Sequence, residues 1–151
     1  MAGKNKLSLS VQYADARLAE LLPRPLLRKT VQAALFFPAN LTVRFVDSQE
    51  GRVLNRDYRE KDYATNVLTF AYTEDDDAAV TQADIVLCVD VLLKEAEEQT
   101  KTIVFHAQHL LVHGVLHAQG YDHEDEQEAN EMEALEVEIL HSLGLPNPYD
   151  E

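Results

Sequence analysis

The sequence predicts an α/β (α+β) protein in which a small mixed sheet of four strands packs against helices. Apolar residues alternate at period two in the first half of the chain and recur every three or four residues in the second half. No internal repeat interrupts this order. The chain has 151 residues, of which 46% are hydrophobic, so it can bury a core, and we expect one domain over residues 1–151.

Four segments are predicted to be strands. Leu7 to Tyr13 and Leu41 to Phe45 carry apolar side chains at every second position, which is typical of a strand with one buried face. Val67 to Tyr72 and Ile85 to Val89 are short apolar runs that fit more deeply buried strands. The acidic segment between them, Thr73 to Gln82, is expected to be a mobile loop.

Two helices are expected near the first strands. Pro25 suits the first turn of a helix, where its missing N–H is not needed, and Pro38 ends that segment. Asp47 and Glu50, three residues apart, resemble a capping box. They predict the start of a second helix that carries Leu54 on its apolar face.

The second half of the chain is predicted to be mostly helical. One stretch runs from Asp90 to Ala118 with a break near residues 99–102, and Gly120 can end it in a left-handed conformation. A last helix runs from about Glu126 to Leu143. The acidic stretch Glu124 to Glu138 is interpreted as the solvated face of this helix, with contact to a basic partner protein as the alternative.

Charge and composition restrict the class of protein. The net charge of −14 argues against broad electrostatic adhesion to nucleic acid or to an anionic membrane, so any binding of RNA requires local positive charge. Cys88 is the only cysteine and lies in a buried apolar run, which favours a reducing compartment. Residues 1–9 lack an apolar signal core and no run approaches a membrane span, so we expect a cytoplasmic protein without a membrane partner.

Three histidines are spaced as ligands of one metal ion. His113 and His117 lie four residues apart on one helical face, and Gly120 lets the chain turn so that His123 can supply a third nitrogen. Three neutral imidazoles and a water make an open tetrahedral zinc site, in which the pKa of the water falls to about 7. The spacing therefore predicts one Zn²⁺ ion and hydrolytic chemistry.

The pattern H-x-x-x-H-x-x-G-x-x-H is that of metzincin peptidases, with one difference. Those peptidases have a Glu general base directly after the first histidine, where this sequence has Gly114. The remaining alternative is that the helical histidines are ordinary packing residues, because His106, His109, His113 and His117 all share one face. His109 and Asp122 are expected to orient the ligands from behind.

Basic residues form a stripe on the second predicted helix. Arg52, Arg56 and Arg59 recur at helical spacing, with Lys61 just beyond them. Guanidinium groups suit phosphate, so this stripe is a candidate RNA-binding surface. The alternative is an ordinary solvated face that pairs with the excess of acidic residues.

Two blocks of sequence resemble the YbeY family of bacterial ribosomal RNA maturation endonucleases. They are Leu54 to Asp62 continuing into Thr65 to Phe70, and His113 to His123. The closing segment Gly144 to Tyr149 also fits. Asn66 and Thr69 stand where the family usually shows Asp and Ser.

The resemblance implies a zincin-like fold, zinc on the three histidines, and an arginine needed for RNA cleavage at Arg59. It further implies a single-strand-specific endoribonuclease that matures the 3′ end of small-subunit ribosomal RNA, serves ribosome quality control and contacts ribosomal proteins. Two alternatives stay open: a ribosome-associated assembly factor in which zinc is mainly structural, and a zinc metallopeptidase, which Gly114 disfavours.

Overall fold

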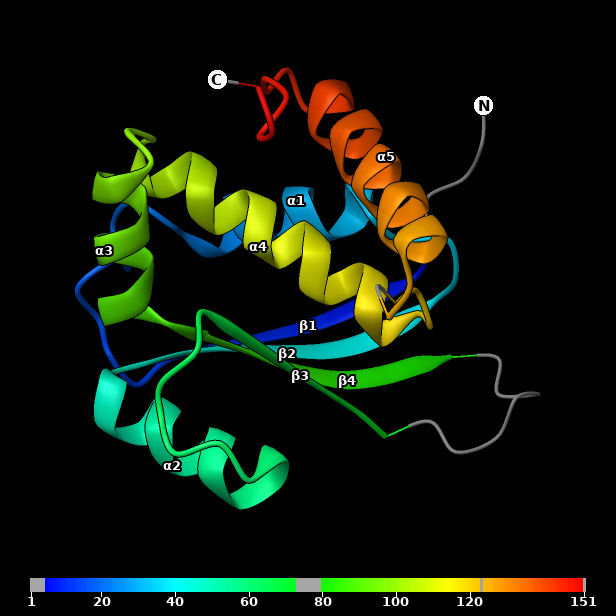
Figure 1. Ribbon diagram of the computed structural model, residues 1–151. Coiled ribbons are helices and arrows are strands. Elements are labelled where there is room, and N and C mark those ends of the chain that lie inside the picture. The colour runs from blue at the N-terminus through cyan, green and yellow to red at the C-terminus, as the bar shows by residue number, and fades with distance from the viewer. Residues whose placement is uncertain (1–4, 73–79, 123, 151) are drawn as a thin grey trace.

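A mixed four-stranded sheet forms the centre of the computed structural model, which describes residues 5–72, 80–122 and 124–150 (Figure 1). The strand order is β1-β2-β4-β3, in which β1, β2 and β4 are parallel and β3 runs antiparallel to β4 at one edge. This confirms the predicted fold class. The strands are β1 (Leu7–Tyr13), β2 (Ala39–Val46), β3 (Val67–Ala71) and β4 (Thr81–Cys88).

The fourth strand begins earlier than the sequence pattern predicted. Thr81 and Gln82 were assigned to the acidic loop, but they pair with Ala39 and Asn40 of β2 and belong to β4. The prediction was wrong there because the residues that pair with them lie about forty positions away in the sequence, and two polar residues give no local hydrophobic signal of a strand. Residues 73–79, for which mobility was predicted, lie outside the described residues.

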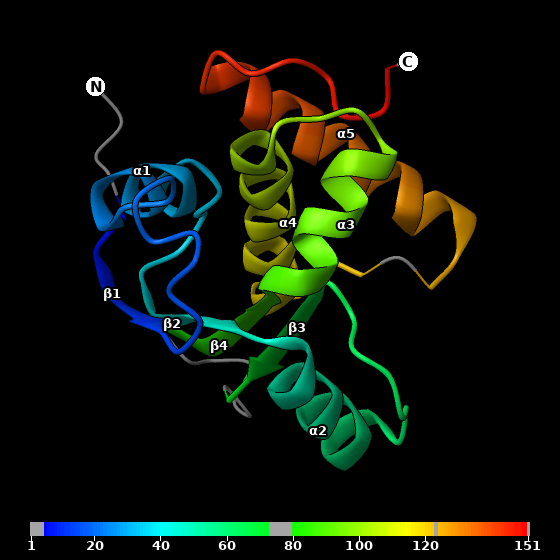
Figure 2. The same cartoon turned by 90° about the vertical axis from the view of Figure 1, so that its left-hand side faces the viewer.

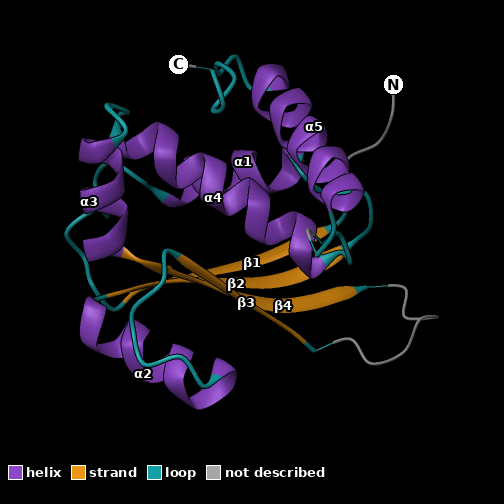
Figure 3. Cartoon of the chain, in the orientation of Figure 1, coloured by secondary structure: helices purple, strands orange, loops and turns teal. Residues whose placement is uncertain are grey.

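Five helices of the described chain accompany the sheet (Figure 3). The predicted capping is confirmed at Asp47, whose side chain accepts a hydrogen bond from the Glu50 N–H at 2.9 Å. The predicted break at residues 99–102 is also confirmed, and Thr102 caps the helix that follows. The helices are α1 (Arg24–Ala33), α2 (Ser48–Arg59), α3 (Val89–Glu98), α4 (Ile103–Ala118) and α5 (Glu126–Ser142).

The two faces of the sheet are covered unequally. Helices α1 and α4 pack on one face and α5 rests on α4, whereas α2 lies alone against the other face (Figures 1 and 2). The larger core fills the first side, with Phe45, Ile85 and Leu111 fully buried. The smaller core, under α2, includes Leu68 and Cys88. No helix in the described part of the chain is long and apolar enough to cross a membrane.

Helix α4 is buried on almost every side because the sheet, α1, α3 and α5 all contact it. It approaches the sheet most closely at Gly114, where an added Cβ would lie 2.9 Å from Cγ2 of Ile85 and 3.3 Å from Oγ1 of Thr69. Because Gly114 has no side chain, α4 packs closer to β3 and β4 than a larger residue at this position would allow. This close packing places the last two turns of α4 beside the edge strand.

Candidate active site

Two histidines of α4 converge at the edge of the sheet. The Nε2 atoms of His113 and His117 are 3.0 Å apart, and their rings stand nearly perpendicular at an angle of 82°. Two ligands of a tetrahedral zinc ion have nitrogens about 3.3 Å apart, given Zn–N bonds of about 2.0–2.1 Å. The two nitrogens thus lie close to the separation that two ligands of one ion require.

A pocket of about 450 Å³ opens beside these rings, and we call it the histidine pocket. Its wall combines the end of α2 and the loop after it, the edge strand β3, the last turns of α4 and the segment that follows α4. Residues far apart in the sequence therefore face one space. The lining residues are Arg59, Thr65, Asn66, Val67, Thr69, His113, His117, Asp122 and Glu124.

A buried carboxylate on α5 holds His113 from behind. Glu136 is fully buried, and its Oε2 lies 2.6 Å from Nδ1 of His113, while its Oε1 lies 2.8 Å from Nε2 of His109. The hydroxyl of Tyr149 also donates a hydrogen bond to Oε1. One carboxylate thus joins α4, α5 and the segment after α5.

The environment keeps Glu136 ionised. Burial alone raises the pKa of this carboxyl group, but the hydrogen bonds from His109, His113 and Tyr149 outweigh burial and lower the pKa to about 2. An ionised carboxylate only accepts hydrogen bonds, so Nδ1 of His113 carries the proton and Nε2 presents its lone pair to the pocket. This is the arrangement in which a carboxylate orients a metal-binding histidine, and the two described imidazoles would supply two nitrogen ligands.

The role of Glu136 was missed in the sequence, where the whole stretch Glu124 to Glu138 was interpreted as solvated. That interpretation is wrong for Glu136, which is 0% exposed. A signal was available, because Glu136 lies four residues after Met132 and four before Leu140, and both are buried on the apolar stripe of α5. A charged residue in the middle of such a stripe needs a partner inside the protein.

The other predicted metal-site residues fall in different places. His109 is buried behind the pocket and shares Glu136 with His113, whereas Asp122 lies exposed on the pocket wall. His123 lies outside the described residues, so the third ligand stays a prediction. Within residues 5–72, 80–122 and 124–150, no group of three or more His, Cys, Asp or Glu side chains is arranged to hold a metal ion.

The basic stripe divides into paired and pocket-facing residues. Arg52 makes two hydrogen bonds to Asp62, at 2.7 and 2.9 Å, and Arg56 pairs with Asp57 at 3.3 Å. Arg59 lines the histidine pocket and makes no ion pair with any described residue.

Arg59 is therefore the arginine whose charge faces the pocket. Helix α2 ends directly after it, at Glu60, whose φ of 61° turns the chain away. Lys61 follows that turn and is exposed.

Asn66 on the pocket wall uses both ends of its side-chain amide in hydrogen bonds. Its amide N–H donates to Glu95 at 3.1 Å and its Oδ1 accepts from the backbone N–H of Val67 at 2.7 Å. Glu95 also contacts Nε2 of His106 at 2.9 Å. The amide thus joins the pocket wall to α3 and α4, and His106 has its own partner away from the histidine pocket.

Comparison with known proteins gives one consistent family. The family described as "Endoribonuclease YbeY" matches residues 5–144. Two relatives of that name, from Herminiimonas arsenicoxydans and Janthinobacterium sp. (strain Marseille), are each 67% identical and cover 98% and 99% of this chain and 98% of their own lengths. A solution structure from Thermotoga maritima is similar with a TM-score of 0.55 at 22% identity, covers 96% of each chain, and supports the fold.

Proposed function

Because this chain belongs to the YbeY endoribonuclease family, we propose that it is a metal-dependent endoribonuclease that cleaves single-stranded RNA at the histidine pocket. We further propose that it matures the 3′ end of small-subunit ribosomal RNA and serves ribosome quality control in the cytoplasm, in contact with the ribosome and its proteins. The observation that carries the proposal is the meeting of Arg59 with His113 and His117 in one pocket.

In this proposal one Zn²⁺ ion is held by His113, His117 and His123. Zinc, when bound, supplies a Lewis acid that activates water for attack on phosphorus at neutral pH. The fit rests on the paired Nε2 atoms and on Glu136, which holds the proton of His113 on Nδ1. His109 is within hydrogen-bonding distance of the other oxygen of the Glu136 carboxylate and helps to fix the position of that carboxylate.

Arg59 contributes the positive charge that the transition state needs. Arg59 lines the pocket that holds the two imidazoles, so its guanidinium is suited to bind a phosphate and to neutralise charge that develops on the phosphoryl oxygens. Asp122 and Glu124, which also line the pocket, are the acids nearest to the histidines in the sequence, and we assign Asp122 to orienting them. Arg56 and Lys61 extend the phosphate-binding surface outside the pocket, and Arg52 contributes less because Asp62 neutralises it.

The metallopeptidase alternative fails on space as well as on sequence. A glutamate in place of Gly114 would put its Cβ 2.9 Å from Ile85, which is fully buried. The peptidase base therefore has no room in this packing of α4 on the sheet. The proposed hydrolysis of a phosphodiester bond needs no side chain at that position.

Cleavage of a labelled single-stranded RNA and of the same sequence as a duplex tests the proposal. His117→Ala should abolish cleavage, and Arg59→Ala should lower kcat by about 10²–10³-fold, as loss of one group that stabilises developing charge does. Arg52→Ala is the matched control on the same helix and should keep activity near wild type. Full activity in His117→Ala would refute the proposal, and normal preribosome binding without cleavage in the wild type would favour the assembly-factor alternative.

A further inference from the structure

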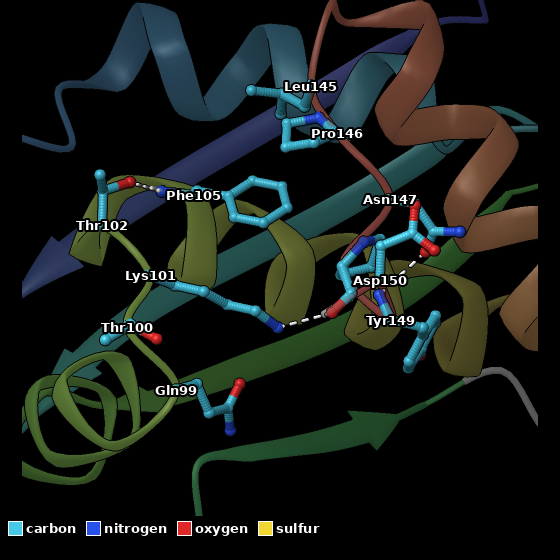
Figure 4. A pocket seen from close by; sticks show the side chains of 11 residues that line it. Gln99, Thr100, Lys101, Thr102, Phe105, Leu145, Pro146, Asn147, Tyr149 and Asp150 are labelled. Atoms are coloured by element: carbon cyan, nitrogen blue, oxygen red, sulfur yellow. Dashed lines mark hydrogen bonds between the residues drawn. The ribbon is translucent and has the colours of Figure 1, made fainter.

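The segment after α5 folds back over the start of α4 and borders a second pocket, of about 870 Å³, away from the histidine pocket (Figure 4). Lys101 fastens this segment, since its Nζ donates a hydrogen bond to the carbonyl of Pro148 at 2.7 Å. The backbone N–H of Tyr149 donates to Oδ1 of Asn147 at 2.8 Å. These contacts tie down the backbone from which the Tyr149 side chain extends.

Tyr149 connects this segment to the histidines. Its ring stands edge-on to His109, with centroids 5.4 Å apart at 87°, and its hydroxyl donates to Oε1 of Glu136. The second oxygen of Glu136 accepts the hydrogen bond from His113. Burial, reinforced by the Glu136 carboxylate, raises the pKa of Tyr149, so the hydroxyl keeps its proton and stays a donor.

We propose that Tyr149 is a positioning residue of the metal site, whose hydroxyl fixes Glu136 and thereby aims Nε2 of His113 into the histidine pocket. This inference rests on the proposed function, because it takes His113 to be a metal ligand. Glu136 has three hydrogen-bonding partners, and Tyr149 is the one that comes from outside α4. Without the hydroxyl, Oε1 keeps only the contact to His109, and the carboxylate can rotate away from the orientation that His113 requires.

Zinc affinity of the metal-free protein, measured by competition with a fluorescent zinc chelator, tests the inference separately from RNA cleavage. Tyr149→Phe removes the hydroxyl and keeps the ring against His109. Groups behind a metal ligand typically change metal affinity by about 10–100-fold, and Tyr149 acts through one further residue, so we expect a weakening of about 3–10-fold. Lys101→Ala, which frees the segment without touching Glu136, should weaken zinc binding in the same direction.

Tyr13→Phe is the matched control. The Tyr13 hydroxyl also donates one hydrogen bond, to the carbonyl of Leu22 at 2.7 Å, but it lies on β1 and has no connection to Glu136. Its zinc affinity should equal that of the wild type, while the thermal midpoint of its metal-free form reports the general cost of losing a tyrosine hydroxyl.

Equal zinc affinities of the two tyrosine variants would overturn the inference and leave the proposed function standing. A wild type that binds zinc no better than His117→Ala would overturn the proposed function itself. Should Tyr149→Phe not fold, an unchanged affinity in Lys101→Ala would count against the inference.

Discussion

Replacing Gly114 by alanine should destabilise the protein, although alanine is the better helix former. The new Cβ would meet Cγ2 of Ile85 at 2.9 Å and Cγ2 of Val67 at 3.4 Å. Ile85 is 0% exposed and β-branched, so its methyl group cannot swing aside and the helix has to move. Overpacking of this kind costs about 1–3 kcal/mol, and the removal of a helical glycine returns about 1 kcal/mol. The net loss in the free energy of unfolding should be about 1 kcal/mol, within a range of about 0–2 kcal/mol.

Gly51 in α2 provides the matched control, because the same substitution there meets only ordinary contacts. Its added Cβ would lie 3.4 Å from Sγ of Cys88 and 3.7 Å from Cβ of Ala64. Gly51→Ala should therefore stabilise the protein by about 0.5–1 kcal/mol.

Urea unfolding measures both free energies. Heating should separate the two thermal midpoints by roughly 3–8 °C, since 1 kcal/mol moves the midpoint of a chain of this size by about 2–4 °C. A Gly114→Ala protein that is as stable as Gly51→Ala would refute the close packing of α4 on the sheet, and with it the steric reason against a glutamate base at that position.

Three further predictions concern charge and metal. Lys61→Ala should weaken binding to single-stranded RNA and reduce the magnitude of the slope of log affinity against log salt concentration by about 0.7. Arg52→Ala should change the affinity and the slope less, because Asp62 already neutralises that guanidinium. Filter binding at several salt concentrations compares the two variants. The hydrogen bond from Arg17 lowers the pKa of Asp90, so the carboxylate stabilises the fold above the ordinary pKa and this contribution is lost as pH falls through the lowered one. Asp90→Asn should therefore cost less than about 1 kcal/mol at pH 7, and this cost should shrink as pH falls below the ordinary pKa of the carboxyl group; a gap between the urea midpoints that stays as large in acid as at pH 7 would contradict this. Zinc at a free concentration of 100 times its Kd should add about 2.7 kcal/mol to the free energy of unfolding. Removing this zinc with a chelator should therefore lower the thermal midpoint by about 5–10 °C. A midpoint that does not change when the chelator is added would contradict the presence of a bound ion.

The sequence predicted best what local chemistry determines. Alternation predicted two of the strands and short apolar runs the other two, the Asp47 cap predicted the start of α2, and the break near residues 99–102 separated α3 from α4. What it could not predict depends on distant partners. The early start of β4 follows from pairing with β2, and the burial of Glu136 follows from histidines more than twenty positions away.

The candidate site was predicted in part for the same reason. The helical spacing of His113 and His117 suffices to put both rings on one face, and the structure brings them together. The position of Arg59 in the same pocket depends on how α2 and β3 meet at the sheet edge, so the catalytic role expected for Arg59 came from the family resemblance alone. Tyr149 gave no periodic signal, because it lies beyond the last helix and acts through a side chain of another element.

Gly120, which ends the turn after α4, has a backbone conformation that an L-amino acid rarely adopts. Its φ is 101°, and an added Cβ would meet nothing within 4 Å. Bulk is therefore tolerated there, and only the chirality of an L-residue is penalised. A chemically synthesised chain with D-alanine at this position should retain the corner that leads from α4 to Asp122 on the pocket wall, whereas L-alanine of identical volume should strain it.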